Sequence, residues 1–304
     1  MRSRGLIVAV IILAALTGVL YWSQHRKPPA ETPATSTAAT PMIVKVDPST
    51  VAQLVIKQKG ADPVTVEKTK AGQWQITGPK PYRADQEAVA GILSILSGLR
   101  SDRLVEDRAT DRAQFGLDNP SAEVDAGTHQ LLLGDDTPTG GDVYVAVSGD
   151  PRVFTVPSYE KTSLAKSLND LRDKNLLTLS QDKVSRVELI RKGEDLEFDR
   201  TKDGWQMLKP SPAPADATAV NELVRSLTDA RMDLSGAGAG FAQATPVGTA
   251  KLTGDSGVQT LEIRKNKDDY YAKSSATEGT YKVDSSIAQA MDKKPDDFLT
   301  KKKI

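Results

Sequence analysis

The chain contains no cysteine and very few histidines, and each shortage excludes a class of protein. Without cysteine, its 304 residues cannot form disulfides, zinc–thiolate sites, iron–sulfur clusters or thiol nucleophiles. The two histidines, His25 and His129, leave almost no room for an imidazole-built metal site or for a Ser-His-Asp triad. We therefore expect no metal site and no bound cofactor.

Charge is balanced over the whole chain, with 40 Lys and Arg residues against 40 Asp and Glu residues. Residues 1–27 hold four of the basic side chains and no acidic one, so residues 28–304 carry 36 basic and 40 acidic side chains, a net charge of −4. A mildly acidic body with few aromatic residues lacks the basic surface that phosphate binding requires. No nucleic-acid partner is therefore expected. At about 150 residues per domain, the length predicts two globular units.

A long apolar run occurs at the N-terminus. Residues 5–22 contain no charged residue and span about 27 Å as a helix, just enough to cross the hydrocarbon core of a membrane. Arginine flanks the run on both sides, and Tyr21 and Trp22 lie where an interfacial aromatic belt is expected. A cleaved signal peptide is the alternative, but its apolar region is normally about 7–15 residues long and ends at a small-x-small site, which is missing. We expect an uncleaved transmembrane signal anchor at 5–22 after a cytoplasmic N-terminus at 1–4.

The following segment, residues 23–42, has four prolines and no apolar periodicity. This composition predicts an extended Pro/Ala/Thr-rich linker. The basic residues on the two sides of the anchor differ by only about one charge, which orients it weakly. Such a stalk usually raises a domain from the outer face of a bacterial inner membrane. We therefore expect a single-pass protein of the inner (cytoplasmic) membrane with an extracytoplasmic, periplasmic body.

Internal similarity divides that body into two copies of one module. Residues 74–97 and 205–228 share nine identities in 24 positions at an offset of 131. Upstream, residues 51–60 match residues 184–193 at an offset of 133, so a two-residue difference falls in a hairpin turn. Downstream, the segments 142–147 and 153–156 resemble 269–274 and 280–283. Duplication explains this pattern, and it predicts module 1 at 43–177 and module 2 at 178–304.

Each copy predicts the same elements. Alternating apolar residues, such as Leu54 and Ile56, indicate three short strands, the third of which contains Trp74 or Trp205. Apolar residues at helical spacing then predict a helix, through Val89 to Leu96 and through Val220 to Leu227. Further strands are expected at about 129–134, 142–148 and 152–156, followed by a short helix through Leu164, Leu168 and Leu171. Because the strands come in hairpin-joined groups, the expected fold class is α+β, a tandem duplicated module of antiparallel strands plus helices, preceded by one transmembrane helix.

Two pairs of equivalent residues are candidates for function. Trp74 and Trp205 could stack on a sugar, but large aromatic residues at a sheet–helix contact usually fill the core. Asp85 and Asp216 could act as a general acid and base, but each immediately precedes a helix, where an aspartate caps backbone N–H groups. The structural interpretation is favoured for both pairs.

Several other candidates carry weaker signals. The acidic loop from Gly134 to Asp142 lacks the spacing of a calcium loop, and Gly236–Gly240 lacks that of a phosphate loop. Ser158-x-x-Lys161 and Ser163-x-x-Lys166 match a pattern of some acyl enzymes without its companion motifs. His129 stands beside an apolar strand without an evident partner, and Lys301–Lys303 is expected to be a solvated terminus. We predict no catalytic, cofactor-binding or metal-binding residue.

A set of motifs runs through the body: a Pro-x-Pro-x-x-Ala-Asp helix start occurs in both copies, and a Phe-Gly-Leu-Asp-x-Pro turn occurs in the first. The residues concerned are Trp74, Pro79, Ala84, Asp85, Val89, Phe115–Pro120, Gly134, Tyr144 and Leu171–Leu177. This set resembles the bacterial domain-of-unknown-function family 4340 over most of residues 43–300, although the stretch after Phe241 lacks the turn motif. The resemblance implies no catalytic residue, and it implies a partnership with ABC-type export systems related to gliding-motility transporters.

Three hypotheses of function follow. The first is a non-enzymatic, membrane-anchored extracytoplasmic interaction module, an auxiliary component of an ABC-type transport system with a permease, an ATPase or other envelope proteins as partners. The second is an envelope protein that binds a glycan or lipid in the cleft between the two copies, since domain interfaces favour binding pockets. The third, a hydrolase built on Asp85 and Asp216 or on the Ser/Lys pairs, is the least favoured because little reactive chemistry converges.

Overall fold

Alternation of buried and exposed residues gives the first half of the chain a nine-stranded sheet. In β2, Leu54 and Ile56 are buried and Gln53 is exposed. The sheet order is β5-β4-β3-β2-β8-β9-β10-β11-β7, and all neighbours are antiparallel. The strands are β2 (Gln53–Gln58), β3 (Val64–Lys68), β4 (Trp74–Gly78), β5 (Tyr82–Arg83), β7 (Arg103–Glu106), β8 (Ala122–Ala126), β9 (His129–Asp136), β10 (Asp142–Val147) and β11 (Val153–Pro157).

The second half forms an eight-stranded antiparallel sheet in the order β15-β14-β13-β12-β16-β17-β18-β19. Its strands are β12 (Val184–Arg191), β13 (Leu196–Thr201), β14 (Gly204–Lys209), β15 (Ala213–Pro214), β16 (Thr245–Gly254), β17 (Gly257–Asn266), β18 (Asp269–Ser274) and β19 (Thr280–Val283). Apart from β7, each strand of the first sheet has a counterpart at the same place in the second. The predicted internal repeat is therefore confirmed.

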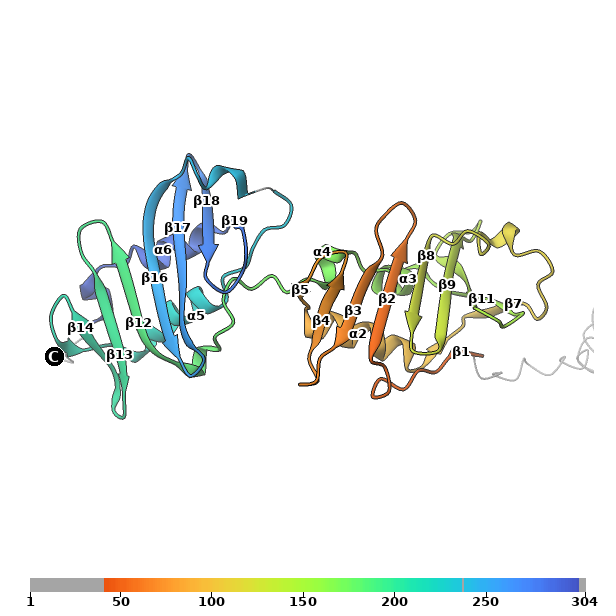
Figure 1. Cartoon of the computed structure of the whole chain (residues 1–304), viewed down its shortest axis with the longest axis horizontal. Coiled ribbons are helices and arrows are strands. Elements are labelled where there is room, and N and C mark those ends of the chain that lie inside the picture. Colours follow the sequence, from red (N-terminus) through yellow and green to blue (C-terminus); the bar gives the residue numbers. More distant parts are fainter. Residues whose placement is uncertain (1–40, 237, 301–304) are drawn as a thin grey trace, which may run out of the picture.

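This computed structural model describes residues 41–236 and 238–300, and its two modules lie end to end (Figure 1). The segments expected at 1–4 and 5–22, and all but the last two residues of the expected linker 23–42, lie outside the described residues. Met42 begins β1 (Met42–Val44), which pairs with β6 (Leu99–Arg100) in a separate two-stranded sheet. Within the described part, no helix is both long and apolar enough to cross a membrane.

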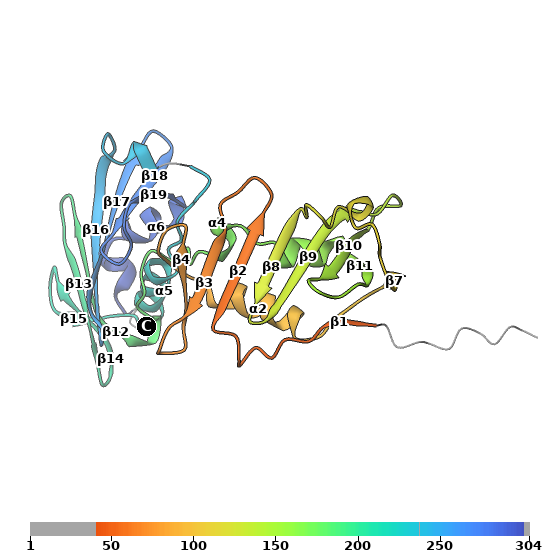
Figure 2. The ribbon, with the colours of Figure 1, turned by 45° about the vertical axis from the view of Figure 1, so that its right-hand side comes forward.

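Helices cover one face of each sheet (Figure 2). The longest are α2 (Gln86–Leu96) and α5 (Ala217–Thr228), which present the predicted apolar stripes. The others are α3 (Ser158–Leu164), α4 (Leu168–Leu171) and α6 (Ser285–Met291). The single helix expected through Leu164, Leu168 and Leu171 is two helices, because Ala165 leaves helical geometry at φ −84° and ψ 60° and Ser167 caps α4.

The expected α+β class is wrong. The described chain consists mostly of antiparallel strands in three sheets, and its longest helix has only 12 residues. The helical periodicity predicted the positions of α2 and α5 but not their small share of the fold. Each helix supplies one apolar stripe to a core whose remaining walls are strands, and β16 and β17 alone have 10 residues each.

Two hydrophobic cores correspond to the two sheets. The first extends from Ile43 to Leu171, and the second extends from Leu176 to Phe298. Leu176 and Leu177, the last residues of the expected module 1, pack in the second core. Residues between Leu171 and Leu176 therefore form the connection between the modules.

Candidate functional site

A cleft of about 590 Å³ opens where the two modules meet. Module 1 lines it with residues of β4, β5 and the start of α2, and module 2 lines it with residues before β12 and at the end of α5. The connecting segment crosses it. Polar residues on its walls include Gln73, Gln75, Arg83, Gln86, Asp173, Asn175, Thr178 and Gln181. The lining favours a ligand with many hydrogen-bonding groups over a hydrocarbon chain.

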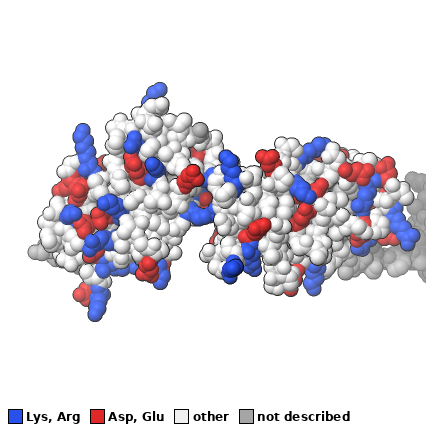
Figure 3. Space-filling view, viewed as in Figure 1, with Lys and Arg blue, Asp and Glu red and all other residues white. Residues whose placement is uncertain are grey.

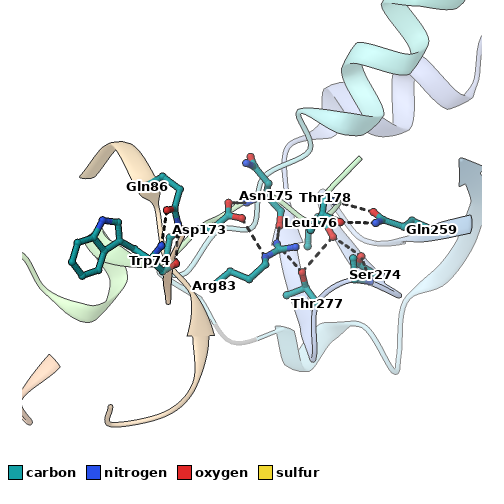
Figure 4. A network of polar contacts seen from close by, with 12 residues as sticks. Trp74, Arg83, Gln86, Asp173, Asn175, Leu176, Thr178, Gln259, Ser274 and Thr277 are labelled. Carbon is teal, nitrogen blue, oxygen red and sulfur yellow. Dashed lines mark hydrogen bonds and ion pairs between the residues drawn. The ribbon is translucent and has the colours of Figure 1, made fainter. Parts of the chain in front are cut away.

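Arg83 stands at the centre of the contacts between the modules (Figure 4). Its Nε lies 3.2 Å from Oδ2 of Asp173. Its Nη2 donates to the carbonyl oxygen of Asn175 and, at 3.2 Å, to Oγ1 of Thr277. One side chain of module 1 therefore contacts the connecting segment and the β18–β19 loop of module 2.

Leu176 and Thr178, which follow the connecting segment, are fixed in module 2 by a second group of hydrogen bonds (Figure 4). The hydroxyls of Ser274 and Thr277 donate to the carbonyl oxygen of Leu176. The backbone N–H of Thr178 donates to Oε1 of Gln259 at 2.9 Å, and Nε2 of Gln259 donates to Oγ1 of Thr178 at 2.5 Å. These bonds hold the two residues against the end of the second sheet.

The duplicated fold allows the junction to be compared with the same place in module 2. In each module, the residue before the helix-capping Asp forms an isolated bridge with the last segment of the module, Ala84 with Arg172 and Ala215 with Leu299. Pro214 in β15 pairs with β14 at the position where Arg83 in β5 pairs with β4, so Pro214 is the counterpart of Arg83. The counterparts of the remaining junction residues Tyr82, Arg172 and Asp173 are Ala213, Leu299 and Thr300. Module 2 forms the same sheet without these four side chains, so the fold does not require them.

The tryptophans fill the cores, as favoured, and do not form the alternative sugar platform. Trp74 is 8% exposed and Trp205 is 6% exposed, and each belongs to the core of its own module. Trp74 shares its core with Leu93 and Leu96, and Trp205 shares its core with Val224 and Leu227. Trp74 also lines the cleft, but its side chain is buried, and the core interpretation is confirmed.

Asp85 and Asp216 are helix caps, one in each module, and the structure does not bring them together. Oδ1 of Asp85 accepts the N–H groups of Glu87 and Ala88 at 3.0 and 3.1 Å. Oδ1 of Asp216 accepts those of Thr218 and Ala219 at 2.8 and 3.1 Å. Both carboxylates thus complete the first helical turn, as the capping interpretation predicts.

The Ser/Lys pairs do not form reactive pairs. Nζ of Lys161 lies 3.2 Å from Oδ1 of Asp136, at the acidic loop. Ser163 donates to the carbonyl oxygen of Tyr159 within α3. Over residues 41–236 and 238–300, no three His, Asp or Glu side chains gather in a way that could hold a metal ion.

The glycine-rich stretch and His129 lie apart from the cleft. Gly238–Gly240 packs against β19, where the hydroxyl of Thr280 donates to the carbonyl oxygen of Gly238 at 3.0 Å. Nδ1 of His129 lies 3.4 Å from the hydroxyl of its neighbour Thr128. Lys301–Lys303 lies outside the described residues.

The turn motif at Phe115–Pro120 is part of the fold. Phe115 and Leu117 form a small cluster with Ala146 and Val153, and the ring of Phe115 lies 4.9 Å from that of Tyr144. Gly134 permits this packing, since a Cβ there would lie 2.2 Å from the carbonyl oxygen of Phe115. The motif therefore fixes a loop onto the first sheet.

Sequence reasoning missed the junction residues Tyr82 and Arg83. A signal was present, because these positions differ between two copies that agree at the neighbouring Ala and Asp. Sequence reasoning also missed Glu160, whose pKa is raised by burial and by the negative charge of Asp102. Its Oε2 is buried without a hydrogen-bond partner in the described chain, but it does not line the cleft.

Comparison with known proteins identifies a family. The family profile described as domain of unknown function (DUF4340) matches residues 74–239 and residues 205–303, and its two matches begin at the equivalent residues Trp74 and Trp205. No curated protein and no solved structure matches the chain. The matched residues cover most of both modules, and the chain therefore belongs to the DUF4340 family.

Proposed function

We propose that the protein is a non-enzymatic, membrane-anchored accessory subunit whose extracytoplasmic body docks on a partner in the envelope. The junction carries this proposal. Tyr82, Arg83, Arg172 and Asp173 are dispensable for the module fold, and they join two modules into one unit. A protein that acts by docking on a partner needs its two modules in such a fixed arrangement. An enzyme would instead need reactive groups close together, and the candidate groups lie apart from one another.

An ABC-type transport system is the proposed partner, and this part rests on the family resemblance. The proposed anchor is the apolar run at 5–22, which would place the permease and the modules at the same inner membrane. The face of each sheet that the helices leave uncovered carries charges of both signs (Figure 3). Some are paired across strands, as Lys57 is with Glu123 and Asp125 at 3.0 Å.

Co-purification tests the proposal. The tagged full chain is extracted in a mild detergent, and bound proteins are identified by mass spectrometry against an Arg83→Ala, Asp173→Ala variant. We expect a permease or ATPase to be enriched with the natural chain and reduced with the variant. Recovery of no membrane protein above background would refute the proposal.

Alkaline phosphatase fused after residue 45 should be active, since the body is proposed to be exported.

A second candidate function is binding of a glycan in the inter-module cleft. The polar walls described above support a glycan over a lipid, because amide and hydroxyl side chains can pair with sugar hydroxyls. A soluble N-acetylglucosamine tetramer serves as the probe in isothermal titration. Gln75→Ala should weaken binding, whereas Gln206→Ala, the equivalent change in module 2, should not. Absence of heat beyond dilution would count against this candidate.

A further inference from the structure

Arg172 is a buried cation without a counter-charge. It is 9% exposed, and its guanidinium lies 4.0 Å from the ring centroid of Tyr82 and 5.3 Å from that of Tyr281. Its side chain makes one hydrogen bond, from Nη2 to the hydroxyl of Tyr281 at 2.5 Å. Throughout residues 41–236 and 238–300, no carboxylate lies within 4.0 Å of it. Burial of an unpaired charge is costly, and the remaining N–H donors are available for an anion.

Arg83 adds a second unused donor beside it. Its Nη1 is buried and has no hydrogen-bond partner in the described chain. Its Nε and Nη2 are occupied by Asp173, Asn175 and Thr277, as described above. Asp173 balances the charge of Arg83, so the unbalanced positive charge is that of Arg172.

Both arginines line one small cavity, which we call the junction pocket. It has a volume of about 150 Å³ and is bounded by Tyr82, Arg83, Arg172, Asp173, Thr277 and Glu278. A water molecule occupies about 30 Å³ of liquid, so the pocket has room for a group of four or five heavy atoms. Glu278, a second carboxylate of the lining, is exposed and has no ion-pair partner among the described residues, so its negative charge opposes an anion.

We propose that the junction pocket binds an oxyanion, the phosphate or carboxylate group of a small molecule or of a larger ligand. Such a group supplies the missing negative charge and accepts hydrogen bonds from guanidinium groups, which are strong when both partners are charged. The module fold does not explain the two arginines, because Pro214 and Leu299 occupy their places in module 2. The bound group would contact β5, the connecting segment and the β18–β19 loop at once. This proposal does not rest on the proposed function.

Titration of the full chain in detergent tests the proposal. Inorganic phosphate represents a free anion, glycerophosphoglycerol a phosphodiester headgroup and acetate a carboxylate, with sodium chloride at equal ionic strength as the blank. We expect at least one of the three to bind saturably in calorimetry and to raise Tm, because a ligand that binds only the folded state stabilises it. Arg172→Leu, which introduces the residue of module 2, should weaken binding about tenfold or more, the usual effect of losing a charged hydrogen bond.

Two further variants make the result specific. Arg200→Leu also removes an arginine from an aromatic ring, that of Trp205 at 4.8 Å, but outside the pocket, and it should leave binding unchanged. Glu278→Gln removes the opposing charge at the pocket and should tighten binding; because Glu278 is exposed, this variant should fold even if Arg172→Leu does not. The proposal is overturned if no anion exceeds the chloride blank, or if Arg172→Leu binds as the natural chain does. It is also overturned if Glu278→Gln fails to tighten binding.

Discussion

Trp74 and Trp205 show how one position is used in two copies of a module. Each lies opposite a basic residue on the neighbouring strand, Lys68 and Arg200, and each basic group lies over the indole ring, at 5.6 and 4.8 Å from the centroid. Nε1 of Trp205 also donates to Oδ1 of Asn221 at 2.9 Å. The ring itself is buried in both modules, so its main contribution is to stability.

We predict that Trp74→Ala and Trp205→Ala each lower the free energy of unfolding by about 3–5 kcal/mol, through lost burial and a cavity. The loss at Trp205 should be the larger by about 1 kcal/mol, since a hydrogen bond is also removed. Urea unfolding of the full chain in detergent measures both. Tyr159→Ala is the control, because Tyr159 is 68% exposed and should change stability by less than about 0.5 kcal/mol. Tryptophan variants as stable as this control would contradict the assignment to the core.

Glu160 gives a pH-dependent prediction at the same scale. Its pKa is raised in the folded state by burial and by Asp102, so the folded protein binds more protons than the unfolded chain between the two pKa values. Stability is therefore lost as pH rises through this window. Glu160→Gln should stabilise the protein at neutral pH, and the gain should disappear at about pH 3.5, below the ordinary pKa of a glutamate.

Urea titrations at the two pH values check this prediction. Glu194→Gln is the matched control, because Glu194 is exposed in the turn after β12 and lacks the buried oxygen of Glu160. The control should show a smaller gain at neutral pH. An equal gain in both variants, or one that persists at low pH, would show that the buried carboxylate is not destabilising.

At the scale of elements, the loop that carries Phe115 depends on a close backbone approach. Gly134→Ala should destabilise the protein by about 1–3 kcal/mol, because the new Cβ meets the carbonyl oxygen of Phe115 and the loop must shift. Gly91→Ala makes the same change in the middle of α2, where no atom lies within 4 Å. That variant should be more stable by about 0.5–1 kcal/mol. Thermal unfolding distinguishes the two, and destabilisation by both would mean that the loop contact is not the cause.

Sequence patterns predicted some features of the fold and missed others. Alternation of apolar residues predicted β2, β3 and β4, since burial of one face imposes a period of two. The stretch from Phe241 lacks the turn motif, yet the backbone here also packs closely, since a Cβ at Gly240 would lie 2.4 Å from the ring of Tyr271. Packing on a sheet face tolerates this loss of identity. The expected α+β class was wrong because hydrophobic periodicity gives the position of a helix and not how much of the core that helix covers.

At the scale of the whole molecule, the repeat was predictable and the junction was not. The residues that the copies share, such as Asp85 and Asp216, serve the fold, and they attracted the first functional hypotheses. The roles of Arg83 and Asp173 were found only by comparing equivalent positions of the two modules in the structure. Their network joins residues up to 194 positions apart in sequence. In a duplicated chain, positions that differ between structurally equivalent sites are the better guide to specialised roles.

The last prediction concerns the orientation of the two modules. The chain has no cysteine, so two spin labels can be placed without background, at Lys59→Cys in module 1 and Lys202→Cys in module 2, both in exposed turns. Arg83→Ala should broaden the distribution of distances between these labels, because it removes the ion pair with Asp173 and the bonds to Asn175 and Thr277. Asp173→Ala should broaden it less, since it removes the ion pair but leaves the bonds of Arg83 to Asn175 and Thr277.

Lys57→Ala provides the control for this measurement. It removes two ion pairs within the first sheet, so it should leave the distance between the modules unchanged. A label pair inside module 1, Lys59→Cys with Thr128→Cys, should be unaffected by every variant, which would show that the modules themselves stay folded. If Arg83→Ala left the inter-module distribution as narrow as in the parent, the junction network would not be what holds the modules together. The orientation would then depend on the connecting segment alone.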